Sequence, residues 1–146
     1  MGNRIEEYEL KEISVVITQE LINRYAEVSG DHNLIHLDPE FAKSSMFGHI
    51  IAHGMLTLSL IDQMMDRKFG NVWHATGVTK CKFRGAAAIN DHIKGTGVLK
   101  KSEELDEHLR LIYSVTVRNT NTDETLIGGT CTIAVSYTHL TLPTKA

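Results

Sequence analysis

Residues 29–38, S-G-D-H-N-L-I-H-L-D, gather the side chains of this chain that are best suited to acid–base chemistry. Asp31 offers a carboxylate and His36 an imidazole five positions later, and both groups can transfer protons. Asn33 and Ser29 add an amide and a hydroxyl that can orient their neighbours. An isolated Asp in such a stretch also serves as a turn residue, and an isolated His as a surface residue. The stretch is a candidate catalytic loop, with the turn interpretation kept open.

The second candidate group is a glycine in an apolar segment. Residues 50–61, I-I-A-H-G-M-L-T-L-S-L-I, are apolar nearly all round, which predicts a helix buried on every side. Gly54 falls near its first turn, where backbone N–H groups can hold developing negative charge. Without a Cβ, the backbone there is open to close approach by a ligand. An acid, an imidazole and such an N–H together suit chemistry next to a carbonyl group.

Two predicted helices hold the candidate loop at its ends. The preceding helix has a capping residue, an early acid and a stripe of apolar residues, namely Thr18, Glu20, Leu21, Ile22, Tyr25 and Val28. Gly30 stands where a left-handed residue ends a helix. The following helix starts at D-P-E, residues 38–40, a capping carboxylate followed by a proline suited to the first turn. Asp31 and His36 are therefore expected on a short loop with two rigid ends.

The remainder of the chain predicts an antiparallel sheet. Residues 8–17 alternate as in a first strand, and the central helix ends at Gly70 after two cations in its last turn. Beyond it a period of two predicts strands over residues 72–84, 91–101, 109–118 and 125–135. This order predicts an α+β fold, with the sheet wrapped around one apolar helix. Residues 1–135 are expected to form a single domain, and the tail 136–146 to lie outside it.

Composition excludes several classes of function. The formal net charge of −3 argues against nucleic-acid binding, which needs a basic surplus. No apolar run is long enough to span a bilayer, and the first residues lack the apolar core of a signal peptide. Cys81 and Cys131 are too few for a disulfide framework and are expected to be reduced. The sequence therefore predicts a cytoplasmic protein with no nucleic-acid or membrane partner.

Residues 28–42, V-S-G-D-H-N-L-I-H-L-D-P-E-F-A, followed by I-A-H-G-M-L at 51–56, resemble the MaoC-like dehydratases. Within that family they are most similar to the single-domain (R)-specific enoyl-CoA hydratases, which have the hot-dog fold. The resemblance is strongest over residues 25–60. Later, residues 83–91 keep the phenylalanine and aspartate of the family's strand-pair motif but lack its proline and glycine.

The resemblance implies reversible hydration of trans-2-enoyl-CoA to (R)-3-hydroxyacyl-CoA, in fatty-acid or polyhydroxyalkanoate metabolism. Asp31 and His36 would hold the water and divide the proton transfers, and the Gly54 N–H would polarise the thioester carbonyl. Which of the two groups acts as base stays open. Asn33, Ser29 and His53 would support the loop. The family also implies a homodimer and no cofactor, because the substrate itself carries coenzyme A; an acyl carrier protein is the alternative carrier.

Other residues have weaker claims to a role in binding. Met55 and Ser59 on the central helix are expected to line the acyl site. Lys80, Lys82 and Arg84 share one strand face and could meet the phosphates of coenzyme A, or simply face solvent. His49 and His53 are four apart and could share a helix face, but no further metal-binding motif accompanies them, so we expect no metal.

Two alternative functions stay open. An acyl-CoA thioesterase of the same fold would use a carboxylate on the central helix, where Asp62 and Asp66 are available. That interpretation gives Asp31 and His36 no task. A non-catalytic acyl-CoA-binding protein would be expected to lack the acid or the imidazole, and both are present.

Overall fold

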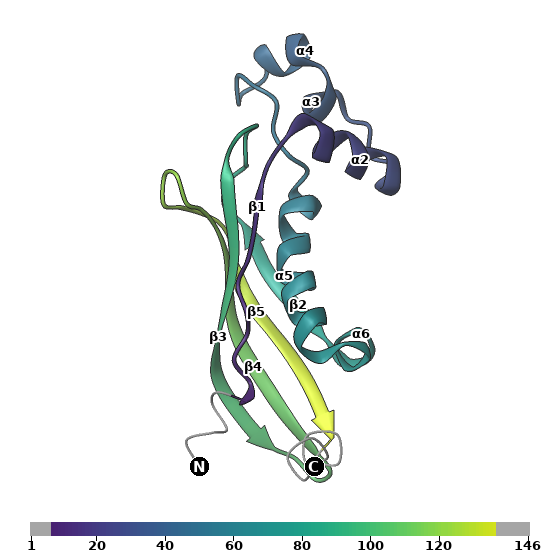
Figure 1. Cartoon of the computed structure of the whole chain (residues 1–146), viewed down its shortest axis with the longest axis vertical. Coiled ribbons are helices and arrows are strands. Elements are labelled where there is room, and N and C mark those ends of the chain that lie inside the picture. Colours follow the sequence, from purple (N-terminus) through teal and green to yellow (C-terminus); the bar gives the residue numbers. More distant parts are fainter. Residues whose placement is uncertain (1–6, 137–146) are drawn as a thin grey trace.

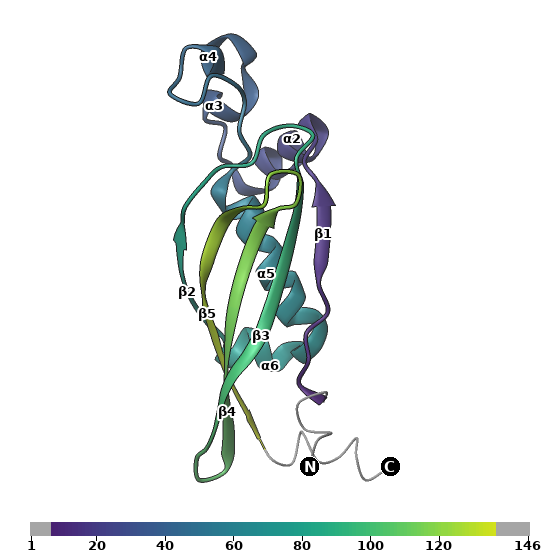
Figure 2. The ribbon, with the colours of Figure 1, turned by 90° about the vertical axis from the view of Figure 1, so that its left-hand side faces the viewer.

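The computed structural model describes residues 7–136. Its main body is a five-stranded antiparallel sheet in the order β1-β3-β4-β5-β2. The strands are β1 (Ile13–Val16), β2 (Val78–Phe83), β3 (His92–Glu104), β4 (His108–Asn119) and β5 (Glu124–Ser136). The helix α5 (Gly54–Phe69) lies against one face of the curved sheet (Figures 1 and 2). The predicted α+β architecture, an antiparallel sheet around a long central helix, is confirmed.

The core lies between α5 and the inner face of the sheet. Alternate residues of β4 are buried as predicted, namely Leu109, Leu111, Tyr113, Val115 and Val117. From α5 the buried residues are Leu56, Thr57, Leu60, Ile61, Met64, Met65 and Phe69. A Cβ on Gly95 of β3 would lie 3.1 Å from the Cβ of Leu60, so this glycine lets the helix pack closely on the strand.

The central helix differs from its prediction in two ways. It is buried on one side only: Met55 on the other side is 58% exposed. It also starts at Gly54 rather than earlier, because residues 50–52 are held in an extended conformation by the connection between β2 and β3. Ile51 forms a bridge with Ala88, and the Ala52 N–H donates to the Ala87 carbonyl at 2.8 Å. The predicted end is confirmed, since Gly70 closes the helix with a φ of 58°.

The helices α2 (Gln19–Ser29), α3 (Leu34–Leu37) and α4 (Pro39–Lys43) form a lobe beyond one end of the sheet (Figure 1). The predicted caps are confirmed: Thr18 accepts from the Leu21 N–H, Gly30 has a φ of 79°, and Asp38 accepts from Glu40 and Phe41. Two expectations are wrong. Val28 is 87% exposed, with Ala26 buried in its place, and His36 lies in a helical turn rather than a loop.

The strand predictions are confirmed for β3, β4 and β5 to within three residues at each end. The predicted strand 72–84 is wrong in its first half, where the helix α6 (Asn71–Thr76) precedes β2. The Trp73 indole N–H donates to Asp62 of α5 at 2.8 Å, a long-range contact that local strand propensity does not encode. β1 is shorter than predicted, because pairing with β3 spans Ile13–Val16 alone. Of the predicted tail, Ser136 ends β5 and residues 137–146 lie outside the described residues.

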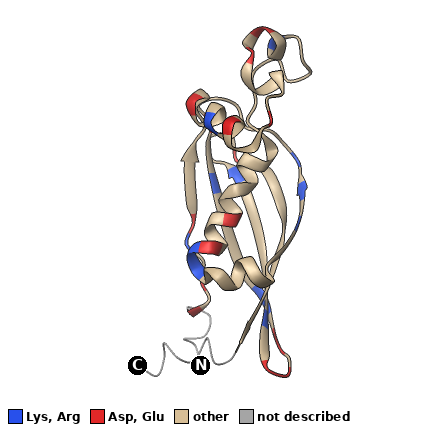
Figure 3. Cartoon of the chain, turned by 90° about the vertical axis from the view of Figure 1, so that its right-hand side faces the viewer, with Lys and Arg blue, Asp and Glu red and all other residues tan. Residues whose placement is uncertain are grey.

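Within residues 7–136, no helix has the length and apolar character needed to cross a bilayer. Both cysteines are free thiols, with Cys131 buried and Cys81 half-buried. Basic side chains recur along β2, the strand at the right-hand edge of the sheet in Figure 3.

Candidate active site

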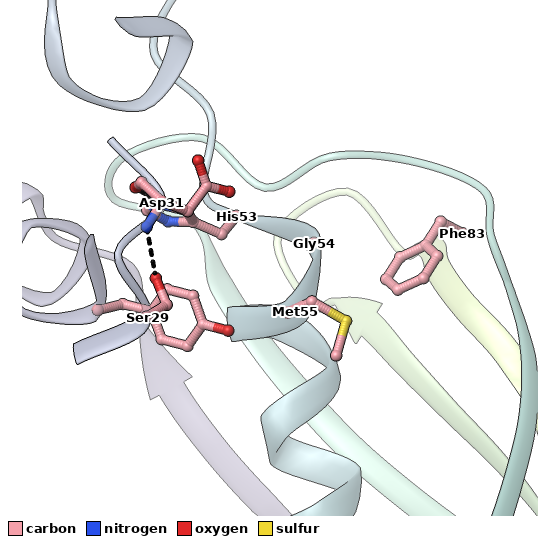
Figure 4. A pocket seen from close by; sticks show the side chains of 7 residues that line it. Ser29, Asp31, His53, Gly54, Met55 and Phe83 are labelled. Atoms are coloured by element: carbon pink, nitrogen blue, oxygen red, sulfur yellow. Dashed lines mark hydrogen bonds between the residues drawn. The ribbon is translucent and has the colours of Figure 1, made fainter. Parts of the chain in front are cut away.

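Asp31 lies on the short connection between α2 and α3, and neighbouring polar groups fix its backbone. Its N–H donates to the Ser29 hydroxyl at 3.1 Å, which Figure 4 marks with a dashed line. One carboxylate oxygen, Oδ1, accepts from the Asn33 N–H at 3.2 Å. The side chain is exposed at the mouth of a cavity, so the carboxylate keeps lone pairs available for a ligand.

His36 is presented by the single turn of α3. Asn33 caps this turn by accepting from the Ile35 N–H at 3.0 Å, and Gln19 of α2 donates to the His36 carbonyl at 3.0 Å. The ring is 8% exposed, with Nδ1 2.8 Å from the carbonyl oxygen of Ile51. Since a carbonyl oxygen only accepts, Nδ1 carries the proton of the neutral ring. The lone pair therefore lies on Nε2.

His53 packs directly on His36. The two rings are stacked, with centroids 3.8 Å apart and planes at 25°. The Nε2 of His53 lies 3.0 Å from the main-chain carbonyl of Asp31, whereas its buried Nδ1 has no hydrogen-bond partner within the described residues. Burial lowers the pKa of His53 below its ordinary value of 6.5, and the neighbouring His36 lowers it further, while the bond to Asp31 acts in the opposite direction.

Gly54 is the first residue of α5, and no acceptor within residues 7–136 pairs with its N–H. A Cβ there would lie 3.2 Å from Cε1 of Phe83, so only glycine leaves this approach uncrowded. A cavity of about 350 Å³ opens at this point, lined by Tyr25, Ser29, Asp31, His53, Gly54, Met55 and Phe83. Figure 4 shows Asp31 and His53 on one side of the cavity and Phe83 on the other, with Gly54 and Met55 between them.

The structure thus brings Asp31, His36, His53 and Gly54 together. A carboxylate oxygen of Asp31 and one ring nitrogen each of His36 and His53 lie within 4.8 Å of one another. One hydrogen-bonded water molecule can bridge such a separation. The same three groups are of the types that bind zinc. The helix face that His49 and His53 could have shared does not form, because α5 starts after both of them.

Of the remaining predicted binding residues, Met55 lines the same cavity as Asp31 and Gly54, and the others lie outside that cavity. Met55 and Ser59 line a second cavity of about 230 Å³, with Leu58, Ile61, Asp62 and Thr79; Met55 borders both cavities. Lys80, Lys82 and Arg84 line a depression of about 470 Å³ with residues of β4 and β5. Because side chains alternate along a strand, this depression lies on the face of β2 opposite Phe83, away from the catalytic candidates.

Tyr25 and Phe83 also line the cavity, and neither was among the predicted site residues. Tyr25 was expected only as part of a helix stripe. Phe83 was noted as the phenylalanine kept from the family's strand-pair motif, which is the one signal that pointed towards the site.

Comparisons with known proteins show the family and the fold of this chain. The family model described as "MaoC like domain" matches residues 1–124. The 3-hydroxyacyl-thioester dehydratase Z of Mycobacterium tuberculosis is 37% identical over 95 residues, which cover 62% of this chain and 63% of the relative. The match thus spans less than two thirds of that relative's length.

Solved structures share the fold. The unliganded R-hydratase PhaJ1 from Pseudomonas aeruginosa has a TM-score of 0.72 and 25% identity, covering 86% of this chain and 78% of that one. The (R)-hydratase from A. caviae involved in PHA biosynthesis has a TM-score of 0.73 and 19% identity, covering 86% and 92%. With a matching model over most of its length and this hot-dog architecture, the chain belongs to the MaoC-like domain family.

Proposed function

We propose that this protein hydrates trans-2-enoyl thioesters of coenzyme A to (R)-3-hydroxyacyl thioesters and catalyses the reverse dehydration. One observation carries the proposal: the Asp31 carboxylate and the imidazole of His36 lie within bridging distance of one another, and Asp31 lines a cavity bordered by the Gly54 N–H, which has no acceptor within residues 7–136. The relatives named as 3-hydroxyacyl-thioester dehydratase and R-hydratase support the same reaction class.

The reaction requires a base that takes a proton from water, delivery of a proton to C2, and stabilisation of the enolate-like oxygen. A bridging water donates its hydrogen bonds to the Asp31 carboxylate and to Nε2 of His36, both of which accept. As the water oxygen bonds to C3 and the C2=C3 π electrons move towards the thioester oxygen, one of these groups takes a proton from the water. That same proton is then delivered to C2 of the enolate-like intermediate, so both groups end in their starting states. The Gly54 N–H stabilises the enolate-like oxygen of the thioester, a contribution of about 3 kcal/mol for a donor of this kind.

The acyl chain has a route along α5. Met55 borders both the catalytic cavity and the second cavity, which continues along the helix past Leu58 and Ser59 towards Asp62 and Thr79. A chain held at Gly54 would therefore extend between α5 and β2. Binding of the coenzyme A phosphates by Lys80, Lys82 and Arg84 stays a prediction, and an acyl carrier protein stays the alternative carrier.

The thioesterase alternative has less support, because both candidate carboxylates of α5 already have partners. Asp62 accepts from the Trp73 indole at 2.8 Å, and Asp66 pairs with His74 at 2.6 Å. We expect Asp62→Asn to retain full hydratase turnover, since an amide oxygen still accepts from Trp73. Loss of all activity in this variant, measured alongside the wild type, would favour the thioesterase.

A homodimer completes the proposal. β2 is an edge strand, and exposed apolar side chains lie on and beside it: Met55, Val78 and Phe83. A second copy joining at this edge would cover them. Elution as a stable monomer in size-exclusion chromatography would contradict this arrangement. The free thiols of Cys81 and Cys131 suit a cytoplasmic location, which we also propose.

The deciding experiment mixes the protein with a trans-2-enoyl-CoA and follows both the enoyl absorbance and free thiol. We expect the absorbance to fall without thiol release, and chiral analysis to give the (R)-3-hydroxy product. Thiol release would identify a thioesterase. No change in either signal, with binding still measurable by calorimetry, would identify a non-catalytic binder.

A further inference from the structure

The ring of His53 lies at the junction of three elements. On one side it meets Tyr25 of α2, with ring centroids 4.8 Å apart, and on the other it stacks on His36 of α3 at 3.8 Å. Its own carbonyl accepts from the Leu56 and Thr57 N–H groups, at 3.0 and 3.2 Å, and so starts α5. His53 thus contacts His36 by its ring, is bonded to Gly54, and reaches Asp31 by a hydrogen bond.

The surroundings of this ring admit one protonation state. Nε2 faces the carbonyl oxygen of Asp31 at 3.0 Å, so Nε2 carries the hydrogen. Nδ1 is buried without a partner in the described residues, so a proton there would be a buried donor left unsatisfied. The groups facing the ring are Tyr25, Asp31, His32 and His36, and the ring is 2% exposed. Burial outweighs the hydrogen bond to the Asp31 carbonyl and the charge of the Asp31 carboxylate, and it lowers the pKa of His53, in agreement with a neutral ring.

A neutral ring with a bare, buried Nδ1 is poorly suited to carry protons in the reaction. It is well suited to fix the distance between Asp31 and His36, because it holds the Asp31 main chain through a hydrogen bond and the His36 ring through a stacked face. Both contacts act on the gap that a bridging water must fill. An error of about 1 Å in such a gap can cost on the order of 10²-fold in rate.

We propose that His53 is a positioning residue for the hydration step, whose Nε2–H and ring face keep the Asp31 carboxylate and the His36 imidazole at a separation that one water molecule bridges. This inference rests on the proposed function and deepens it, since it assigns the second imidazole of the site a task other than proton transfer.

Two substitutions test the hydrogen bond. The amide N–H of Gln at position 53 can occupy the place of Nε2, whereas the shorter Asn can replace only Nδ1. We expect His53→Gln to retain more of the wild-type kcat than His53→Asn, by about tenfold, with KM for the enoyl-CoA within about twofold of the wild type in both. Because His53 does not titrate in the reaction, the acidic limb of the kcat/KM profile should be the same in His53→Gln and the wild type.

Two further variants serve as controls. His53→Phe keeps an aromatic ring between Tyr25 and His36 but removes the donor, and we expect its kcat to fall as in His53→Asn. His49→Gln, a change at an exposed histidine of the same segment, should leave kcat unchanged. Circular dichroism and thermal melts establish that each variant is folded. Equal kcat for the Gln and Asn variants, both folded, would overturn the proposal.

A nitrogen-15 NMR spectrum of histidine-labelled wild type tests the ring without any assay. We expect His53 to give the signature of the neutral Nε2–H form at pH 8, to keep it to a lower pH than an imidazole with the ordinary pKa of 6.5 would, and that signature to be absent in His53→Gln. A His53 signal that titrates at its ordinary pKa of 6.5 would overturn the proposal. If the protein hydrates no enoyl-CoA, the function fails, and this spectrum still decides the state of the ring.

Discussion

Main-chain carbonyls set the tautomer of both buried imidazoles, and they do so in opposite senses. His36 gives its Nδ1–H to Ile51, which leaves a lone pair on Nε2, whereas His53 gives its Nε2–H to Asp31, which leaves a lone pair on a buried Nδ1. Two stacked rings of the same side-chain type thus leave their lone pairs on different nitrogens. The hydrogen bond, not the residue identity, separates the two roles.

At this scale the first prediction concerns Asp31→Asn. Asn has the same shape, and its amide oxygen can still accept from the Asn33 N–H, so the loop should keep its conformation. The variant has lost the charged proton acceptor, and we expect kcat for hydration to fall by about 10²- to 10⁴-fold. Steady-state kinetics with a trans-2-enoyl-CoA measures this, and His36→Ala should show a loss of similar size.

Asp38→Asn is the matched control. Asp38 caps α4 by accepting from backbone N–H groups, and Asn caps a helix about as well as Asp. Both the turnover and the melting temperature of this variant should therefore stay near those of the wild type. Near-normal turnover of Asp31→Asn would remove the carboxylate from the mechanism.

Asp31, His36 and Gly54 can be picked out from the sequence because the chemistry of each is visible in its local neighbourhood. His53 was named as a supporting residue through the family resemblance alone, because its hydrogen bond to Asp31 joins residues 22 positions apart and no local pattern shows it. Phe83 is 29 positions from Gly54, and only the folded chain shows that their backbone and ring meet. Contacts of this length are set by packing, which a linear pattern does not encode.

At the scale of elements, two adjacent glycines of β5 differ in what surrounds them. A Cβ on Gly129 would collide with the backbone of β2, at the Lys80 carbonyl and, at 2.6 Å, at the Cys81 Cα. A Cβ on Gly128 would meet nothing closer than Nε of Arg84, at 3.7 Å. Backbone cannot rotate away as a side chain can, so the first collision must push the two strands apart.

We therefore expect Gly129→Ala to lower the free energy of unfolding by about 1–3 kcal/mol, as overpacking does. Gly128→Ala, its matched control on the same strand, should change it by less than about 0.5 kcal/mol. Urea denaturation followed by circular dichroism measures both. Equal losses in the two variants would mean that strand propensity, rather than the approach of β2, governs this site.

Helix ends were predicted well, and helix α6 was not. Thr18, Gly30, Asp38 and Gly70 act on the backbone within a few residues of themselves, so their effect is local. The segment of α6 carries β-branched and aromatic residues that favour a strand, yet Trp73 is held to α5 by its bond to Asp62. Tertiary contacts override local propensity in this segment.

At the scale of the whole molecule, the site exists because the lobe folds back on the start of α5. The segments 31–36 and 50–54 meet through the Ile51 N–H, which donates to the Ile35 carbonyl at 3.4 Å, and through the bonds made by the rings of His36 and His53. These contacts bury His53, so stability of the fold and integrity of the site are linked.

That link predicts how stability depends on pH. In the unfolded chain His53 takes up a proton as the pH falls through 6.5, whereas burial keeps its pKa lower in the folded protein. Below pH 6.5 the unfolded state thus binds more protons, and the free energy of unfolding must fall with falling pH until the folded pKa is passed. The stabilisation from a neutral His53 is complete above pH 6.5, and one proton changes it by at most about 1.4 kcal/mol per pH unit.

Because other groups also titrate, the test compares wild type with His53→Gln, whose amide does not. Between pH 7.5 and 5.5, the free energy of unfolding measured by urea denaturation should fall more steeply with pH for the wild type than for the variant. The difference in stability between the two proteins should therefore narrow as the pH falls. Parallel curves across this range would mean that position 53 takes up no extra proton on unfolding. The ring would then be solvated in the native state, contrary to its burial between Tyr25 and His36.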